Sequence, residues 1–442
     1  MSFLGKIKTI LRLSLAGIFF FLGLAPTLQA DESSSYDAYS RLLQNKKQEE
    51  SLAEKALSLP AWPLDVIRGG MDQSLYALEQ YHVIDKLKWV YERLTDYGLY
   101  PKLQNLANFG DFGAGLEVDA VKLLRQKGNL PYLRVKSGVN WSHSNFFRVF
   151  SEIGMDKVEE IGPYGSLYFD LENRPEEDFF GFGPDTSLGD SHNFKSEAKL
   201  LELRLGYSLT LHTDLKATFG YKTVDIEDGD DGGKAPMDRN VSGAGGGDFL
   251  ISGMELMHDT RDFPEDPHKG GFERIKVSYH EGVDGYDFGY FKYRGEFARY
   301  HELFSERQVI GGRIVAEHND EVNHQDIPFF DMARLGGYGV SPSPGDTHRG
   351  FQRNRFFGES LFLLNLEYRY LVWQYRELSM DAVIFLDEGQ VFNELNRIQL
   401  RDFRESFGGG FRFKILRRAI LSLEAAKSDE GVELYARSHT PF

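Results

Sequence analysis

The sequence predicts an all-β protein, a transmembrane antiparallel β-barrel with a polar lumen, and three observations support this prediction. Beyond the first 30 residues, no stretch reaches the roughly 18 uninterrupted apolar residues of a membrane-spanning helix. From about residue 110, apolar and polar residues alternate with a period of two. The chain also contains 35 Phe and 22 Tyr, an aromatic content typical of barrels with interfacial girdles. Because only helices and closed barrels satisfy the backbone inside lipid, a barrel is the expected architecture.

The N-terminus, residues 1–30, has the pattern of a secretory signal peptide rather than a retained membrane helix. A basic start, an apolar run and a plausible cleavage site follow in order: Lys6, Lys8 and Arg12, then Leu13 to Leu24, then Leu28 to Ala30. Removing these residues takes away three positive charges and no negative ones, which moves the net charge from -16 to -19. Such an acidic chain is not expected to bind nucleic acid. The absence of cysteine excludes disulfides and thiolate metal sites, and we expect no cofactor.

Residues 31–100 differ from the rest of the chain and predict short periplasmic α-helices. Apolar residues recur at helical spacing from Trp62 to Leu94, with a break near Gly69 and Gly70. Two interpretations remain open for this segment. The helices either pack against the barrel mouth or form a docking site for a periplasmic partner.

The C-terminal part of the chain, from residue 101 to 442, is expected to form the barrel. Fifteen segments alternate as strands do, and because bacterial barrels nearly always have an even number, we expect 16 strands, with the misread one before residue 200. The segments are 111–123, 131–141, 145–155, 163–173, 194–211, 214–225, 247–260, 270–282, 286–301, 307–319, 359–373, 376–388, 405–416, 418–428 and 431–442.

The late strands show which face should meet lipid and which should line the lumen. In the segment 359–373, alternate apolar residues from Phe362 to Val372 share one face, and Asn365, Glu367 and Arg369 share the other. In the next two segments, Phe385 and Asp387, then Arg412 and Lys414, fall on the lumen face. A soluble sandwich would place its apolar face inward and would rarely repeat charges there.

The segment from Pro328 to Phe357 is too long for a simple turn and carries a recognisable motif. It contains the sequence His348-Arg349-Gly350-Phe351, and a later strand carries Phe385, Asp387 and Gly389 in a Phe-x-Asp-x-Gly pattern. This resembles the BamA-type outer-membrane assembly-factor superfamily, the bacterial surface antigen domain. In that family the sixth external loop folds back into the lumen, and its Arg-Gly-Phe/Tyr tip docks on the strand with the second motif.

The resemblance implies a structural latch formed by Arg349, Gly350 and Phe351 with Phe385, Asp387 and Gly389. Inside a narrow lumen, Arg349 needs an anion, and Asp387 can offer a charge-assisted, bidentate hydrogen bond. Leaving either charge unpaired would cost about 3–5 kcal/mol by analogy with buried pairs. Gly350 would let the loop turn sharply where a Cβ would collide with the wall.

Two further segments resemble the family, and two features depart from it. Phe179–Thr186 is similar to its Phe-x-Gly-x-Gly run, and Asp259–Gly271 is similar to its turn between two middle strands. Residues 31–100 lack the strands of a POTRA repeat, so we expect none. Pro441, before the final Phe442, cannot donate to a strand ladder, which would loosen the seam between first and last strands, where the family is thought to insert its clients.

The resemblance implies a factor that inserts or moves proteins or lipids into or across the outer membrane of a Gram-negative-type bacterium. Its expected partners are outer-membrane lipid and unfolded outer-membrane or secreted protein clients. A periplasmic partner at the N-terminal helices joins them if those helices form a docking site. A passive or gated pore for small solutes is the alternative. An enzyme is not expected, because no nucleophile elbow or His-Glu-x-x-His motif is present. The acidic loop Glu227–Gly233 and the group from His318 to Asp326 fit solvated external loops better than metal sites, so we expect no metal.

Overall fold

The computed structural model describes residues 83–105, 112–120, 132–142, 146–157, 160–229, 234–338, 345–393 and 402–438. The expected signal peptide, the helical segment up to residue 82 and the seam residues Pro441 and Phe442 lie outside the described residues. Part of the acidic loop Glu227–Gly233 lies outside them as well. These expectations therefore remain predictions.

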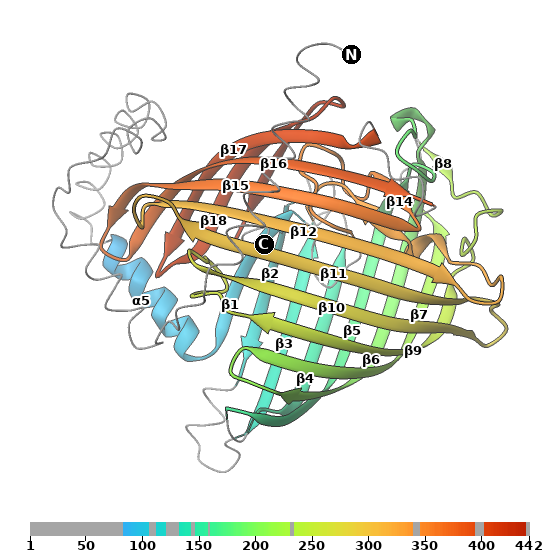
Figure 1. The fold of residues 1–442 in the computed structure, drawn as a ribbon, viewed down its shortest axis with the longest axis horizontal. Coiled ribbons are helices and arrows are strands. Elements are labelled where there is room, and N and C mark those ends of the chain that lie inside the picture. The colour runs from blue at the N-terminus through green and yellow to red at the C-terminus, as the bar shows by residue number, and fades with distance from the viewer. Residues whose placement is uncertain are drawn as a thin grey trace.

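Sixteen strands form a meander in the described part of the chain, and each pairs antiparallel with the next (Figure 1). This confirms the expected fold class and strand number. The strands are β1 (Leu99–Asn105), β2 (Phe112–Asp119), β3 (Leu133–Ser142), β4 (Phe147–Met155), β5 (Gly162–Phe179), β6 (His192–Ser208), β7 (Thr213–Asp228), β9 (Gly247–Asp259), β10 (Gly270–Val283), β11 (Gly289–Glu302), β12 (Gln308–Glu321), β15 (Ser360–Tyr375), β16 (Leu378–Phe392), β17 (Arg404–Ile415), β18 (Arg418–Lys427) and β19 (Val432–Arg437).

The strand that the sequence pattern missed is β1, which directly follows helix α5 (Val83–Asp96). The barrel therefore begins at Leu99, and the boundary expected at residue 101 was slightly late. β1 was missed because it has only seven residues and contains Pro101, which is uncommon inside strands. Among the described residues, no helix has the length and apolar character needed to cross a membrane.

The two edges of the sheet, β1 and β19, lie side by side, with Cα atoms within 8 Å of one another. No backbone register joins them in the described stretches, whereas every other neighbouring pair has one. β19 has six residues and β1 has seven, while β5, the longest strand, has 18. The seam is therefore the weakest-paired part of the wall, since a strand contributes stability through its ladder.

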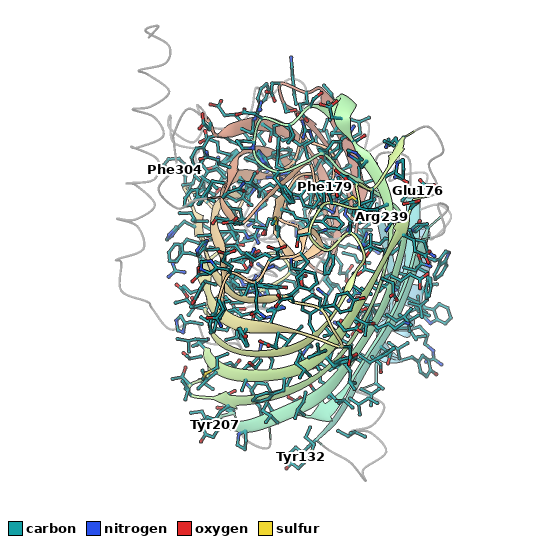
Figure 2. The ribbon with its side chains drawn as sticks, turned by 90° about the vertical axis from the view of Figure 1, so that its right-hand side faces the viewer. Tyr132, Glu176, Phe179, Tyr207, Arg239 and Phe304 are labelled. Carbon is teal, nitrogen blue, oxygen red and sulfur yellow. The ribbon has the colours of Figure 1, made fainter. Side chains whose placement is uncertain are left out.

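The outer face of the barrel is apolar and the inner face is charged. On β6, Leu201, Leu203 and Leu205 are 43–48% exposed, whereas Glu202 and Arg204 alternate with them on the inside. Figure 2 shows Tyr207 and Phe304 at the outer edge of the barrel, as expected for an aromatic girdle. Exposed apolar side chains in this arrangement meet lipid rather than water.

The ends of the barrel can be told apart by their connections. Short turns such as 376–377 and 416–417 join strands at one end, and longer segments such as 322–359 join them at the other. In outer-membrane barrels the short turns are periplasmic and the long loops extracellular. The long loop, defined here as residues 322–359, contains the short helix η2 (Phe329–Asp331) and the paired strands β13 (Ala333–Leu335) and β14 (Phe356–Gly358).

Two smaller elements complete the described part. β8 (Ala235–Pro236) pairs parallel with β6, and the short helix η1 (Leu188–Asp190) lies between β5 and β6. An aromatic core lies in the extracellular part of the lumen, where η2 packs against the extracellular ends of the surrounding strands. Its buried aromatic members are Phe179, Phe194, Phe249, Tyr290, Phe329, Phe330 and Phe357.

Candidate functional site: a latch inside the lumen

The long loop folds back into the barrel and packs on the inner wall of β12, β15 and β16. Eight apolar side chains make this contact, and each is 1% exposed or less: Val315, Ala333, Leu335, Phe351, Phe356, Leu361, Leu363 and Val391. Burying a side chain of this size from water contributes about 1.5–3 kcal/mol. Apolar burial therefore contributes most of the attachment of the loop to the wall, and the charged groups of the loop determine the position of its tip.

The tip of the loop places Arg349 against Asp387 of β16, as the resemblance implied. The guanidinium donates from Nε to Asp387 Oδ2 at 2.7 Å and from Nη2 to Oδ1 at 2.7 Å. The backbone N–H of Arg349 donates to Oδ2 at 3.0 Å. Both residues are 0% exposed. This is a bidentate, charge-assisted contact without competing solvent, which is the strongest kind of side-chain hydrogen bonding.

The other residues of the two motifs shape the space around this pair. The Arg349 guanidinium carbon lies 3.4 Å from the centroid of the Phe385 ring, a cation–π contact. A Cβ on Gly389 would lie 2.9 Å from the Leu335 side chain. Gly350 has φ +87°, and a Cβ there would lie 2.9 Å from Ser406 Cβ. Both glycines therefore allow an approach of loop and wall that any side chain would obstruct.

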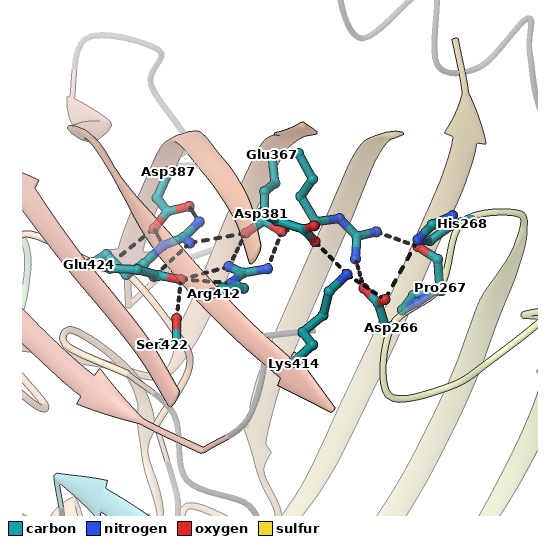
Figure 3. A network of polar contacts seen from close by, with 12 residues as sticks. Asp266, Pro267, His268, Glu367, Asp381, Asp387, Arg412, Lys414, Ser422 and Glu424 are labelled. Carbon is teal, nitrogen blue, oxygen red and sulfur yellow. Dashed lines mark hydrogen bonds and ion pairs between the residues drawn. The ribbon is translucent and has the colours of Figure 1, made fainter. Parts of the chain in front are cut away.

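A second arginine shares the acidic partners of the tip, and the sequence had placed it only on the lumen face. Arg412 of β17 donates to both Glu367 oxygens at 2.6 Å, and to Glu424 Oε1 from Nε at 2.9 Å. Arg349 Nη1 also reaches Glu367 at 3.3 Å and Glu424 at 3.5 Å. Figure 3 shows Arg412 between Glu367 and Glu424 in this network. Two cations and three carboxylates thus satisfy one another within the lumen.

The tip also contacts the last strand, beside the seam. The N–H of Gly350 donates to the Tyr435 hydroxyl at 3.0 Å, and Ser428 Oγ donates to the Gly350 carbonyl at 2.6 Å. Tyr435 belongs to β19, the strand with the shortest ladder. Sequence reasoning chose Pro441 and Phe442 as seam residues and missed Tyr435. Its position as an inward aromatic on the final strand was the signal that could have identified it.

Two further carboxylates anchor the loop to the wall of the barrel. Asp346 accepts from Arg294 of β11 at 2.7 and 2.8 Å and from Arg313 of β12 at 3.1 Å. Asp331 accepts from Lys222 of β7 and from the Tyr290 hydroxyl, each at 2.5 Å. Together with Arg349, the Asp331 contact makes the loop a bridge across the lumen from β7 to β16.

The early motif Phe179–Thr186 covers the loop from the extracellular side. The N–H of Gly183 donates to the Phe357 carbonyl at 2.7 Å. Arg355 of the loop donates to Thr186 Oγ1 at 2.6 Å and to the Thr186 carbonyl at 2.5 Å. The motif therefore belongs to the same extracellular cap as the loop, which its sequence alone did not reveal.

The other family-like segment forms the turn between β9 and β10, and it reaches across the periplasmic end of the lumen. Asp266 in this turn accepts from Arg369 of β15 at 2.9 Å and from Lys414 of β17 at 2.8 Å. Burial alone would raise the pKa of Asp266, but Lys414, His268 and Arg369 outweigh it and hold the pKa well below its usual range. The turn is thus attached to β15 and β17, which lie three and five strands beyond β10 around the ring.

The same turn contains His268, which lies between two carboxylates. Its ring nitrogens lie 3.6 Å from Asp266 and 3.5 Å from Glu302. Burial alone would lower the pKa of His268, but these two carboxylates outweigh it and raise the pKa above its usual value. When it is protonated, the imidazole fastens the turn to β11 through Glu302.

The part of the lumen that the loop leaves open is a cavity of about 860 Å³. It extends along the inner faces of β3–β7 and β9–β12 from Asp156 and Tyr164 near the periplasmic end to Asp331 and Met332 of the loop. Basic and acidic side chains alternate on its wall, for example Lys216 with Glu255 at 3.0 Å. Within the described residues, no group of three or more His, Asp or Glu side chains has an arrangement suited to a metal ion.

The Omp85 superfamily domain matches residues 135–416, which is more than half of the chain. The chain belongs to the Omp85 superfamily. This Omp85 protein is 28% identical over 180 residues to the outer membrane protein assembly factor BamA of Nitratidesulfovibrio vulgaris, a match that covers 38% of this chain and 21% of that relative. The chain thus spans about a fifth of the length of that curated relative.

Two solved structures share the fold of this Omp85 protein. One is BamA from Haemophilus ducreyi lacking POTRA domains 1–3, with a TM-score of 0.53, 14% identity, and coverage of 77% of this chain and 69% of that one. The other is CdiB from Escherichia coli, with a TM-score of 0.52, 12% identity, and coverage of 77% and 62%. Omp85 members are outer-membrane proteins of Gram-negative bacteria, and this chain is an outer-membrane barrel of that kind.

Proposed function

We propose that this Omp85 protein inserts or translocates protein clients at the outer membrane, and that release of the Arg349 latch is its moving part. The observation that carries the proposal is the solvent-free pairing of Arg349 with Asp387 in a loop that bridges the lumen. The relative in Nitratidesulfovibrio vulgaris, which bears the name of an assembly factor, supports the same class of function. Omp85 members are assembly or translocation factors rather than typical enzymes.

The geometry explains how a latch could control the seam. Gly350, next to Arg349, is hydrogen-bonded to Tyr435 of β19, whose other edge faces β1 without a backbone register. A seated tip therefore braces the last strand from inside the barrel. A tip that moves away would remove this brace from the strand with the fewest ladder hydrogen bonds, where a client strand could pair.

A gated pore for small solutes is the second candidate, and the lumen cavity is the observation that favours it. A space of about 860 Å³ with charged walls holds water and ions readily. The loop and its cap close the extracellular end in this structure, so conduction would require the same movement of the loop.

Reconstitution into liposomes separates these functions. We would follow insertion of an unfolded outer-membrane barrel client by protease protection, together with ion flux. The samples are wild type, Arg349→Ala, empty vesicles and Arg239→Ala, whose arginine lies on an exposed loop and is 55% exposed in its side chain. Assembly predicts that wild type and Arg239→Ala speed insertion and that Arg349→Ala does not. Ion flux with no gain in insertion over empty vesicles would support the pore instead.

A further inference from the structure

Two segments enter the lumen from opposite ends, and the inner faces of β15 and β17 connect them. The long loop descends from the extracellular side with Arg349 at its tip. The turn Thr260–Lys269 enters from the periplasmic side with Asp266. Between them, β15 carries Glu367 and Arg369 and β17 carries Arg412 and Lys414, and each of these four is 5% exposed or less.

These side chains form one continuous chain of opposite charges, which Figure 3 follows from Asp387 to His268. Arg349 contacts Glu367 at 3.3 Å, and Arg369 Nε lies 3.6 Å from the same carboxylate. Arg369 Nη1 then donates to Asp266 at 2.9 Å. Glu367 thus lies between two cations, Arg349 of the long loop and Arg369, which holds the turn.

We infer that the long loop and the β9–β10 turn are energetically coupled through Glu367 and Arg369. When Arg349 leaves, Glu367 loses one of its cations in a site with little water, where an unbalanced charge is costly. Arg369, whose Nε already lies 3.6 Å from Glu367, is the cation that can move closer and compensate. When Arg369 moves toward Glu367 it moves away from Asp266, and the turn loses one of the hydrogen bonds that attach it to the wall.

Coupling of this kind acts equally in both directions. Displacement of the turn frees Arg369 from Asp266, and Arg369 then competes with Arg349 for Glu367. An event at the periplasmic mouth therefore weakens the latch above it. If the latch works as proposed, this gives a client arriving from the periplasm a route to the loop; the coupling itself does not depend on that function.

A control variant can separate this coupling from a general loosening of the long loop. The loop carries a second buried arginine, Arg355, that lies outside the row of charges between Asp387 and His268. Arg355 is 1% exposed, like the tip, and holds the loop to Thr186 and Glu430. It contacts neither Glu367 nor Asp266 among its described partners. Replacing Arg355 weakens the attachment of the loop but leaves the contacts between Glu367, Arg369 and Asp266 unchanged.

Hydrogen exchange of the full-length protein in nanodiscs, read by mass spectrometry, tests the coupling without any activity assay. The reporting amides are His268 and Lys269, which donate to Asp262 Oδ1 at 2.8 and 3.1 Å. In Arg349→Met we expect their exchange to rise about tenfold, within the 5–150-fold range usual for coupled sites. In Arg355→Met we expect no change there. Arg349→Gln, which also removes the charge, provides the same comparison if the Met variant does not fold.

The reverse experiment uses the turn. Asp266→Asn should raise exchange at the amides of Arg349 and Gly350 by a similar factor. Glu265→Gln, an exposed neighbour whose carboxylate lies 2.8 Å from Arg418, should not. Unchanged turn exchange in Arg349→Met, or equal increases in both arginine variants, would overturn the inference. Coupling without client insertion would leave the inference standing and refute the assembly function. Insertion without coupling would do the opposite.

Discussion

Replacing Asp387 by Asn keeps the shape of the side chain and removes the charge that Arg349 faces. Asp387 accepts three hydrogen bonds from Arg349 and one from Asn365, and it is 0% exposed. Breaking a buried pair on one side typically costs about 3–5 kcal/mol. Since Arg349 keeps Glu367 and Glu424 at 3.3 and 3.5 Å, we expect the lower end, about 3 kcal/mol.

The measurement is the free energy of unfolding in urea, followed by the gel-mobility shift of the folded barrel. The matched control is Asp185→Asn, whose side chain is 90% exposed and lies 3.4 Å from Arg404. An exposed pair contributes about 0–1 kcal/mol, so the control should unfold like wild type. Equal stability of Asp387→Asn and Asp185→Asn would refute the reasoning, because the latch would then contribute no more than a surface pair.

Three further predictions concern the tip and the turn. His268 should titrate above pH 6.5 by NMR, and because its pKa is raised in the fold, its contribution is complete below about 6.5 and is lost as pH rises through the folded pKa. Gly350→Ala should destabilise by more than about 1 kcal/mol relative to Gly285→Ala, which has a similar positive φ but open space. Tyr435→Phe should cost about 1–3 kcal/mol in urea unfolding, because the N–H of Gly350 loses its buried acceptor.

Each of these has a clear contrary result. A His268 midpoint below 6.5 would mean that burial outweighs the two carboxylates. Equal losses for the two glycine variants would mean that the positive φ, rather than the approach to Ser406, sets the cost. Wild-type stability of Tyr435→Phe would show that the tip does not brace the last strand.

Most of the barrel strands could be predicted, because the alternation of apolar and polar residues along a strand indicates which side chains face lipid and which face the lumen. The charged inner positions of β15–β17 could be assigned from sequence, since an outer-membrane barrel puts polar residues inside and the strands keep one register. β1 could not be predicted, because its seven residues include a proline and are too few to show a clear alternation. A bulge between Leu371 and Trp373 also ends the simple alternation of β15, which a period of two does not anticipate.

The latch pair could be predicted from the resemblance, but the network around it could not. Arg412 and Glu367 were known only to face the lumen, and which lumen residues meet depends on the position of each strand around the ring. The contacts of Asp266 with Arg369 and Lys414 join segments more than 100 positions apart in the chain. Pairings between opposite walls leave no periodic signal in a single sequence.

The most direct test of the account is to fix the loop to the wall covalently. The chain has no cysteine, so Thr347→Cys with Asn365→Cys would introduce a single pair where Asn365 Nδ2 donates to the Thr347 carbonyl at 2.9 Å. Client insertion into liposomes would be measured on the oxidised and the reduced protein. The account predicts that oxidation lowers insertion to the rate of empty vesicles and that reduction restores it. Equal rates in both states would contradict it, because clients would then be inserted with the latch closed.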